Sequence, residues 1–122
     1  MIIEIDNFKC PSLNILYAGV HWAKRKKMVD EIHQLVYYQA INKEKFNQPV
    51  KISYEIHYKG KRRHDPDNAA IKIFTDGLVL AGVLKDDSLK EIKEISITMK
   101  NNQPTDKIII KIDEKRFSKI PR

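Results

Sequence analysis

The sequence contains a single cysteine, Cys10, among its 122 residues. One cysteine cannot form a disulfide within the chain, and a zinc site built from several cysteines is excluded. Long apolar runs are also missing, since no segment approaches the roughly 18 uninterrupted apolar residues of a membrane-spanning helix. The first residues include Glu4 and Asp6, where a secretory signal carries basic residues. We therefore expect a soluble protein of the cytoplasm.

Glycine and proline are scarce, with four and five residues, and no Gly/Ser-rich linker, repeat or low-complexity tract interrupts the chain. Hydrophobic residues make up 42% and charged residues 32%, which is the composition of a globular protein with a strongly ionised surface. The length suits one hydrophobic core and is too small for a separate regulatory module. We expect a single domain over residues 1–122.

Acidic residues are outnumbered: 23 Lys and Arg stand against 16 Asp and Glu, which gives a net charge of +7 and a pI near 9.5. A surface of this sign attracts a polyanion, either nucleic acid or an acidic membrane. The membrane is the weaker alternative, because neither predicted helix opposes a broad apolar face to a wholly basic one. Nucleic acid is therefore the expected partner.

Apolar residues recur at helical spacing in two segments. The first helix is predicted from Ala23 to about Ile41, and the second from about Ala70 to just before Gly82. The apolar residues of the first helix are Met28, Ile32, Leu35, Val36 and Tyr38. Between the first strand and this helix, we expect a loop over residues 10–19.

Four segments have the composition of strands, and three of them alternate apolar with polar residues. They are residues 2–5, 50–58, 95–99 and 108–112. The last two are separated by the turn-prone residues 101–104, which predicts a β-hairpin. The order strand, helix, strand, helix, strand, strand predicts an α/β (α+β) fold, with two main helices packed on a mixed sheet of about four strands.

Two carboxylates, Asp65 and Asp67, flank Pro66 directly after a basic cluster. In an extended backbone, side chains two residues apart point to the same side and can share a divalent cation. Mg²⁺ suits a site with oxygen ligands only, and Mn²⁺ can substitute for it. A further pair, Asp86 and Asp87, follows the second predicted helix. A chain that returns along that helix would bring this pair back to the first.

Both acidic segments have simpler explanations. Asp65-Pro66-Asp67-Asn68 also suits the N-terminal cap of the following helix, and taken alone it favours neither interpretation. Asp86 and Asp87 alone are more typical of a solvated turn. The combination of clustered acids with clustered bases favours a metal site that cleaves phosphodiester bonds.

Two basic clusters lie before these acids in the sequence. Their members are Lys24, Arg25, Lys26 and Lys27 in the first cluster and Lys61, Arg62 and Arg63 in the second. Such clusters are often only solvated surface. His21 and Trp22 beside the first cluster can stack on unpaired bases while the cations hold phosphates, so a nucleic-acid contact is favoured.

Together these motifs resemble the RusA family of Holliday-junction resolvases, which combine Asp-x-Asp-Asn, a helix with a Lys and an Asp-x-Leu, and then an Asp-Asp pair. The matching segments here are Asp65-Pro66-Asp67-Asn68, Lys72 with Asp76-Gly77-Leu78, and Asp86-Asp87. Residues 17–27, preceded by Pro11-Ser12-Leu13-Asn14, also look like the N-terminal basic segment of phage-type members. The resemblance covers residues 11–90.

The resemblance implies a homodimeric, Mg²⁺-dependent endodeoxyribonuclease. It would resolve four-way DNA junctions in recombination and repair, in the cytoplasm of a bacterial cell or of a phage-infected host. Asp65, Asp67 and Asp87 match the three metal-binding acids of the family, and Asp86 would be accessory to them.

The family also has a helix Lys that assists at the scissile phosphate, four residues beyond the second Asp. Ile71 holds that place here, and Lys72 lies five residues beyond Asp67. Five residues correspond to about 140° on a regular helix, so Lys72 would point away unless the helix starts late or is distorted. The possible substitutes for Lys72 are Lys61, Arg62, Arg63 and Lys85.

Two other functions agree with the same residues. One is a Mg²⁺-dependent nuclease that acts on flaps, replication forks or another branched structure. The other is a non-catalytic basic DNA-binding module whose acids only cap a helix.

Overall fold

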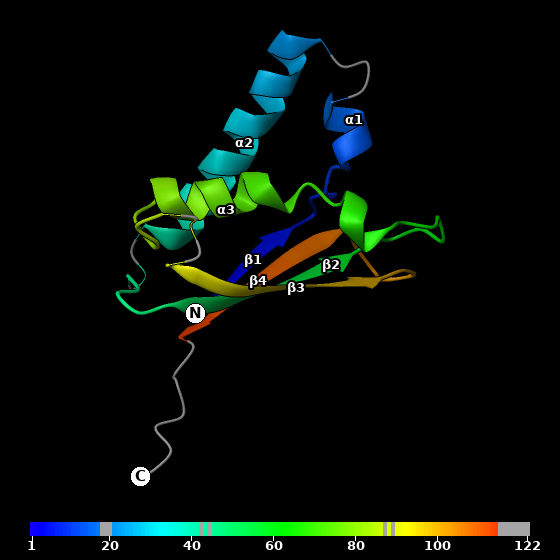
Figure 1. The fold of residues 1–122 in the computed structure, drawn as a ribbon. Helices are drawn as coiled ribbons and strands as arrows, with labels where there is room; N and C mark the ends of the chain where they lie inside the picture. The colour runs from blue at the N-terminus through cyan, green and yellow to red at the C-terminus, as the bar shows by residue number, and fades with distance from the viewer. Residues whose placement is uncertain (18–20, 42, 44, 87, 89, 115–122) are drawn as a thin grey trace.

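Four strands form one mixed sheet in the order β1-β4-β2-β3, and helices α2 and α3 cover one of its faces (Figure 1). This computed structural model describes residues 1–17, 21–41, 43, 45–86, 88 and 90–114. The predicted α+β fold, with two main helices on a sheet of four strands, is confirmed. In chain order the elements are β1 (Ile2–Asp6), α1 (Leu13–Tyr17), α2 (Trp22–Ala40), β2 (Val50–His57), the 3₁₀ turn η1 (Pro66–Asn68), α3 (Ile71–Leu80), β3 (Ile92–Lys100) and β4 (Lys107–Glu114).

The last two strands do not form the predicted hairpin. β3 pairs in parallel with β2, and β4 runs antiparallel between β2 and β1. The connection from β3 to β4 passes the end of β2, where the Gln103 N–H donates to the Tyr58 carbonyl oxygen (3.0 Å). Turn-forming residues indicate that the chain reverses but not which strand it then pairs with. Burial agrees with this order, because β4 has buried alternate residues from 108 to 112, whereas β3 at the edge is mostly exposed.

Helix α2 packs on the sheet and on α3 through one narrow stripe. Ile32, Val36 and Ala40 are its buried residues. Leu35 and Tyr38, which the predicted apolar stripe included, are 38% and 76% exposed, so the prediction was wrong for these two. Within the described ranges, no helix is both long and apolar enough to cross a membrane.

Helix α3 is held firmly between α2 and the sheet. A Cβ atom placed on Gly77 would lie 3.0 Å from the Val36 Cβ atom, so glycine is what permits this close approach of the helices. On the sheet side, the buried Tyr54 hydroxyl is hydrogen-bonded to Thr75 Oγ1. The start of α3, where the acidic segment joins it, therefore has a fixed position relative to β2.

The short helix α1 lies in the segment that the sequence predicted to be a loop. The Leu16 N–H donates to the Ser12 carbonyl oxygen (3.1 Å), and the Leu16 side chain is buried. A helix of five residues is too short to produce a recognisable apolar period. The loop prediction was therefore wrong for Leu13–Tyr17, and residues 18–20 lie outside the described part.

Candidate metal and DNA-binding site

The predicted acidic pair lies on a tight turn rather than on an extended chain. Asp65 itself is extended (φ −104°, ψ 126°), and the next three residues form the 3₁₀ turn η1. The extended backbone expected through Asp65, Pro66 and Asp67 is therefore present only at Asp65, and the expectation that the two carboxylates point to one side stays a prediction. Both side chains are nevertheless exposed, and their carboxylates are of the ligand type that Mg²⁺ prefers.

Neither acid of this turn caps the following helix. Asp65 precedes η1 without a hydrogen bond from a backbone N–H to its side chain. Helix α3 begins later, at Ile71, and its N-cap residue is Ala70, which has no capping side chain. The simpler explanation is therefore wrong for a capping hydrogen bond, although Asp65, Pro66 and Asp67 do occupy the N-terminal positions of η1.

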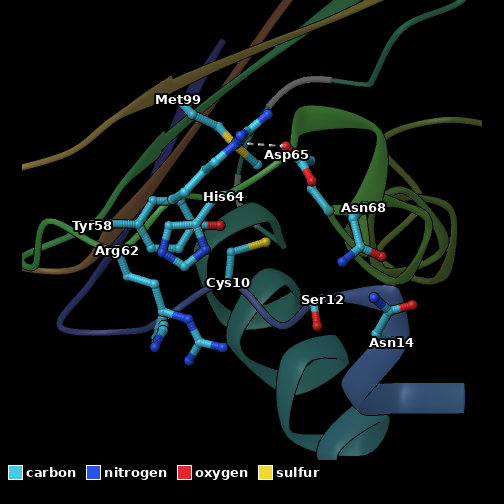
Figure 2. Close-up of a pocket in the computed structure, with 12 residues that line it drawn as sticks. Cys10, Ser12, Asn14, Tyr58, Arg62, His64, Asp65, Asn68 and Met99 are labelled. Atoms are coloured by element: carbon cyan, nitrogen blue, oxygen red, sulfur yellow. Dashed lines mark ion pairs between the residues drawn. The ribbon is translucent and has the colours of Figure 1, made fainter. Parts of the chain in front are cut away.

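Asp65 lies in a positively charged neighbourhood. Its Oδ1 atom is 3.6 Å from Arg63 Nε, and the side chains are 62% and 92% exposed (dashed line in Figure 2). At this distance and exposure the pair is weak, since water screens both charges. The carboxylate thus remains accessible to another cation.

The second acidic segment lies at the other end of α3. The Val50 N–H donates to the Glu91 carbonyl oxygen (2.8 Å), which holds the chain after α3 against the beginning of β2. Asp65 follows the end of β2, and the ten residues of α3, about 15 Å long, separate it from Asp86. Figure 1 shows η1 and the chain after α3 at opposite ends of this helix. The expected return of the chain along the helix does not occur for Asp86.

The predicted cluster of three aspartates is only partly described. Asp87 lies outside the described residues, so its position relative to Asp65 and Asp67 stays a prediction. Among the described residues, no group of three or more His, Cys, Asp or Glu side chains is placed to hold a metal ion. A complete cation site within one chain would therefore need a residue beyond those described.

Lys72 is the second residue of α3 and is exposed. Because α3 starts at Ile71 and Asp67 belongs to the separate turn η1, the two residues do not share a regular helix. The 140° argument against Lys72 therefore does not apply. Its Nζ atom is 3.3 Å from Asp76 Oδ1, one helical turn further along. Of the possible substitutes, Arg62 and Arg63 lie near Asp65, Lys61 is exposed in the same segment, and Lys85 is exposed beyond α3.

A pocket of about 210 Å³ opens beside Asp65 (Figure 2). Three parts of the chain line it: the segment before α1 together with the start of α1, the segment around η1, and the chain at the ends of β2 and β3. Its lining residues are Lys9, Cys10, Ser12, Asn14, Tyr58, Arg62, Arg63, His64, Asp65, Asn68, Ala69 and Met99. Asp67, Lys72 and Asp86 do not line it. The sequence placed Arg62, Arg63 and Asp65 together but did not indicate the contribution of Lys9 and Asn14.

His64, which the sequence analysis left without a role, forms one wall of this pocket. Its ring stacks on Tyr58 with centroids 3.6 Å apart and an interplanar angle of 8°. Partial burial lowers the pKa of His64, and the nearby positive charges of Lys9 and Arg62 lower it further. The pocket therefore combines a flat aromatic wall with a positive electrostatic potential.

Cys10 lies at the inner side of the pocket and is buried. Burial raises the pKa of its thiol to about 12, although a hydrogen bond with the Ala70 backbone acts in the opposite direction. A thiol with this pKa is almost fully protonated at neutral pH and is a poor nucleophile. Cys10 is therefore a packing residue of the pocket.

The first basic cluster lies at the N-terminal end of α2, apart from η1 in Figure 1. Lys24, Lys26 and Lys27 are exposed there, and Trp22 is 68% exposed. Arg25 is partly buried instead, and its Nε atom donates to the Leu16 carbonyl oxygen (2.6 Å). Arg25 thus attaches α2 to α1, which was not expected from the sequence. The exposed lysines and Trp22 retain the arrangement predicted for a nucleic-acid contact.

Searches with protein-family models and among curated proteins found no match for this chain. The functional interpretation consequently depends on the residues and their arrangement.

Proposed function

We propose that this protein is a Mg²⁺-dependent, structure-specific endodeoxyribonuclease of the RusA type, which resolves four-way DNA junctions as a homodimer. Mn²⁺ would substitute for Mg²⁺. The observation that carries the proposal is the acidic turn at Asp65 and Asp67. Its two carboxylates are exposed and do not cap α3, and one of them, Asp65, lines a basic pocket. Exposed carboxylates can hold the divalent ion that phosphodiester cleavage uses, and the net charge of +7 favours a DNA substrate.

The acidic and basic residues of the site would have different roles in the reaction. When bound, Mg²⁺ polarises the scissile phosphodiester and lowers the pKa of a water molecule. Asp65, Asp67 and Asp87 would hold the ion, with Asp86 as an accessory ligand. Arg63, which lies 3.6 Å from Asp65, would offset negative charge that develops on the scissile phosphate. Lys72 remains our candidate for the lysine that the resemblance implies at the scissile phosphate.

A homodimer would supply the third ligand that the described residues of one chain do not place beside Asp65. Because Asp86 lies at the opposite end of α3 from Asp65, we expect the second acidic segment to act on the other subunit's site. In a two-fold dimer this exchange is reciprocal and creates two complete sites. Two opposed sites also match the near two-fold symmetry of a four-way junction, which must lose two opposed strands. A cytoplasmic location, where junctions form and Cys10 stays reduced, agrees with this role.

The direct test is cleavage of a synthetic four-way junction with and without Mg²⁺. Loss of an outer-sphere partner of a metal typically costs about 10–100-fold in activity, so Asp67→Asn should cost at least about 100-fold. The same variant should bind the junction as tightly as wild type in EDTA, because it removes no cation. Asp113→Asn, an exposed acid on β4, is the matched control and should cut normally. A wild-type protein that cuts no junction, or an Asp67→Asn variant that cuts at full rate, overturns the proposal.

A mixed-dimer experiment tests the exchange between subunits. The variants Asp65→Asn/Asp67→Asn and Asp86→Asn/Asp87→Asn should each be inactive. Random mixing makes about half of the dimers mixed, each with one complete site of two, so about a quarter of the wild-type sites should return. Products should be single nicks. If both variants are inactive and mixing restores nothing, each site is built within one chain and the exchange is refuted.

The remaining functions predict different results in the same assays. A nuclease for flaps or forks would cut those substrates faster than a four-way junction of equal length. A non-catalytic DNA-binding module would cut none of them and would show no heat of Mg²⁺ or Mn²⁺ binding in calorimetry. The N-cap residue of α3 is Ala70 and not one of the acids, which favours the nuclease over the non-catalytic module.

A further inference from the structure

The pocket beside Asp65 is lined mainly by residues other than the proposed metal ligands. Of the acids proposed as metal ligands and described here, only Asp65 lines it, at its rim. The other charged residues that line it are the cations Lys9, Arg62 and Arg63, and they outnumber the acids Asp65 and Asp106, which also act on the His64 wall. The pocket therefore has the charge of a site for an anion and not of a site for a cation.

Backbone hydrogen bonds fix the two sides of this pocket relative to each other. The Ala70 N–H donates to the Pro11 carbonyl oxygen (3.1 Å), and Ser12 forms an isolated antiparallel bridge with Ala69. On the other side, the stack of His64 on Tyr58 attaches the segment before η1 to the end of β2. Since the walls are attached at these points, the pocket exists before any ligand binds, and little conformational entropy is lost on binding.

The polar groups around the pocket suit a phosphate group. Lys9 and Arg62 line the pocket from two different segments, and both carry positive charge. Asn14 and Asn68 add amide groups, which Figure 2 shows at the side of the pocket away from Arg62. Charge-assisted N–H···O bonds from such groups are the strongest that a phosphate oxygen accepts in a protein.

We propose that this pocket binds one phosphate of the DNA backbone, adjacent to the phosphate that is cut. The inference rests on the proposed function, because it takes DNA as the substrate. Asp65 borders both the pocket and the proposed metal site, so a phosphate held in the pocket would fix the position of the strand relative to the metal. Lys9 and Arg62 are then binding residues, and they select which phosphodiester bond is presented for cleavage.

The test uses two probes and three variants of the full chain. Inorganic phosphate is titrated into the ¹⁵N-labelled protein while the amide resonances around the pocket are followed by NMR. The four-way junction is titrated separately in EDTA, at several salt concentrations. Lys9→Gln and Arg62→Gln each remove one exposed cation of the pocket, and Lys111→Gln removes an exposed cation from β4 as the matched control.

Phosphate should shift the resonances of His64, Asn14 and Asn68, and Arg62→Gln should abolish these shifts. Each pocket variant should weaken junction binding about tenfold, as expected for one lost charge-assisted hydrogen bond. The slope of log K against log salt should also become shallower by up to about 0.9, the value for one phosphate contact. Lys111→Gln should change neither the affinity by more than about twofold nor the phosphate shifts.

Two results would overturn this inference. If phosphate leaves the pocket resonances unchanged and all three variants bind DNA alike, the pocket is not an anion site. If phosphate binds there but the pocket variants bind DNA like Lys111→Gln, the pocket takes free phosphate and not the DNA backbone. If the proposed function is wrong but this inference is right, the result is different: the wild-type protein binds junctions through the pocket but does not cut them.

Discussion

Replacement of Asp65 or Asp67 by alanine should leave the stability of the fold nearly unchanged. Asp65 contributes one ion pair with Arg63, 3.6 Å long, between side chains that are 62% and 92% exposed. After allowance for screening by solvent, such a pair contributes less than about 0.5 kcal/mol. Asp67 is an exposed residue of a turn, and its substitution should change the free energy of unfolding by no more than about 0.5 kcal/mol. An acid that caps a helix would instead cost typically about 1 kcal/mol, and up to about 2 kcal/mol, on replacement by alanine.

Urea-induced unfolding, followed by circular dichroism at neutral pH, distinguishes these values. Asp65→Ala and Asp67→Ala are compared with His21→Ala, which removes a side chain that does cap α2 by accepting from the Ala23 N–H (3.2 Å). We expect His21→Ala to lower the free energy of unfolding by about 0.5–1 kcal/mol, and the two acid variants to unfold at nearly the wild-type midpoint. A loss above about 1.5 kcal/mol for either acid variant would refute our view that these carboxylates are available for function.

Three further predictions concern other parts of the chain. In Gly77→Ala, the 3.0 Å approach of the new Cβ atom to Val36 should cost about 1–3 kcal/mol, and improved helix propensity should offset about 1 kcal/mol of this cost. The net result is a loss of up to about 2 kcal/mol in the free energy of unfolding. An unfolding midpoint above that of wild type would contradict this packing. Cys10, with a pKa raised to about 12 by burial, should react with a thiol reagent at least about 100-fold more slowly in the native protein than in urea, and equal rates would contradict its burial. Hydrogen bonds from His57 and Lys100 lower the pKa of Glu55 below its ordinary value of 4.5. The ionised Glu55 side chain therefore stabilises the folded state above pH 4.5, and this contribution is lost as the pH falls through the lowered pKa. Glu55→Gln should therefore cost up to about 1 kcal/mol at neutral pH and nothing near pH 2, and a cost that persists in acid would contradict this assignment.

Most of the secondary structure follows from local patterns in the sequence. The alternation in β2 and β4 and the apolar spacing of α3 are visible because a buried face repeats along each element. Strand pairing was not predictable in the same way. The turn at residues 101–104 has the same residues whether β4 pairs with β3 or with β2, and the outcome depends on burial across the whole sheet.

The candidate site could likewise be predicted only where its residues are adjacent in the sequence. Asp65, Asp67 and the neighbouring arginines are adjacent in the sequence, so their clustering could be predicted. The pocket could not, because Asn14 and Met99 reach it from distant segments. The position of Asp86 was also hidden, since it depends on the parallel pairing of β2 with β3, which places the start of β3 far from the end of β2. Local spacing carries no information about that pairing.

A crystal structure of the protein grown with Mn²⁺ tests the central claim most directly, because anomalous scattering locates the ion without reference to any assumed site. We predict a Mn²⁺ ion bound by Asp65 and Asp67 of one subunit together with Asp87 of the partner subunit, at metal–oxygen distances of about 2.1 Å. Two such sites related by a two-fold axis should be present in the dimer. A structure with no ion at Asp65 and Asp67, or with no third carboxylate supplied to them by either subunit, would contradict the account.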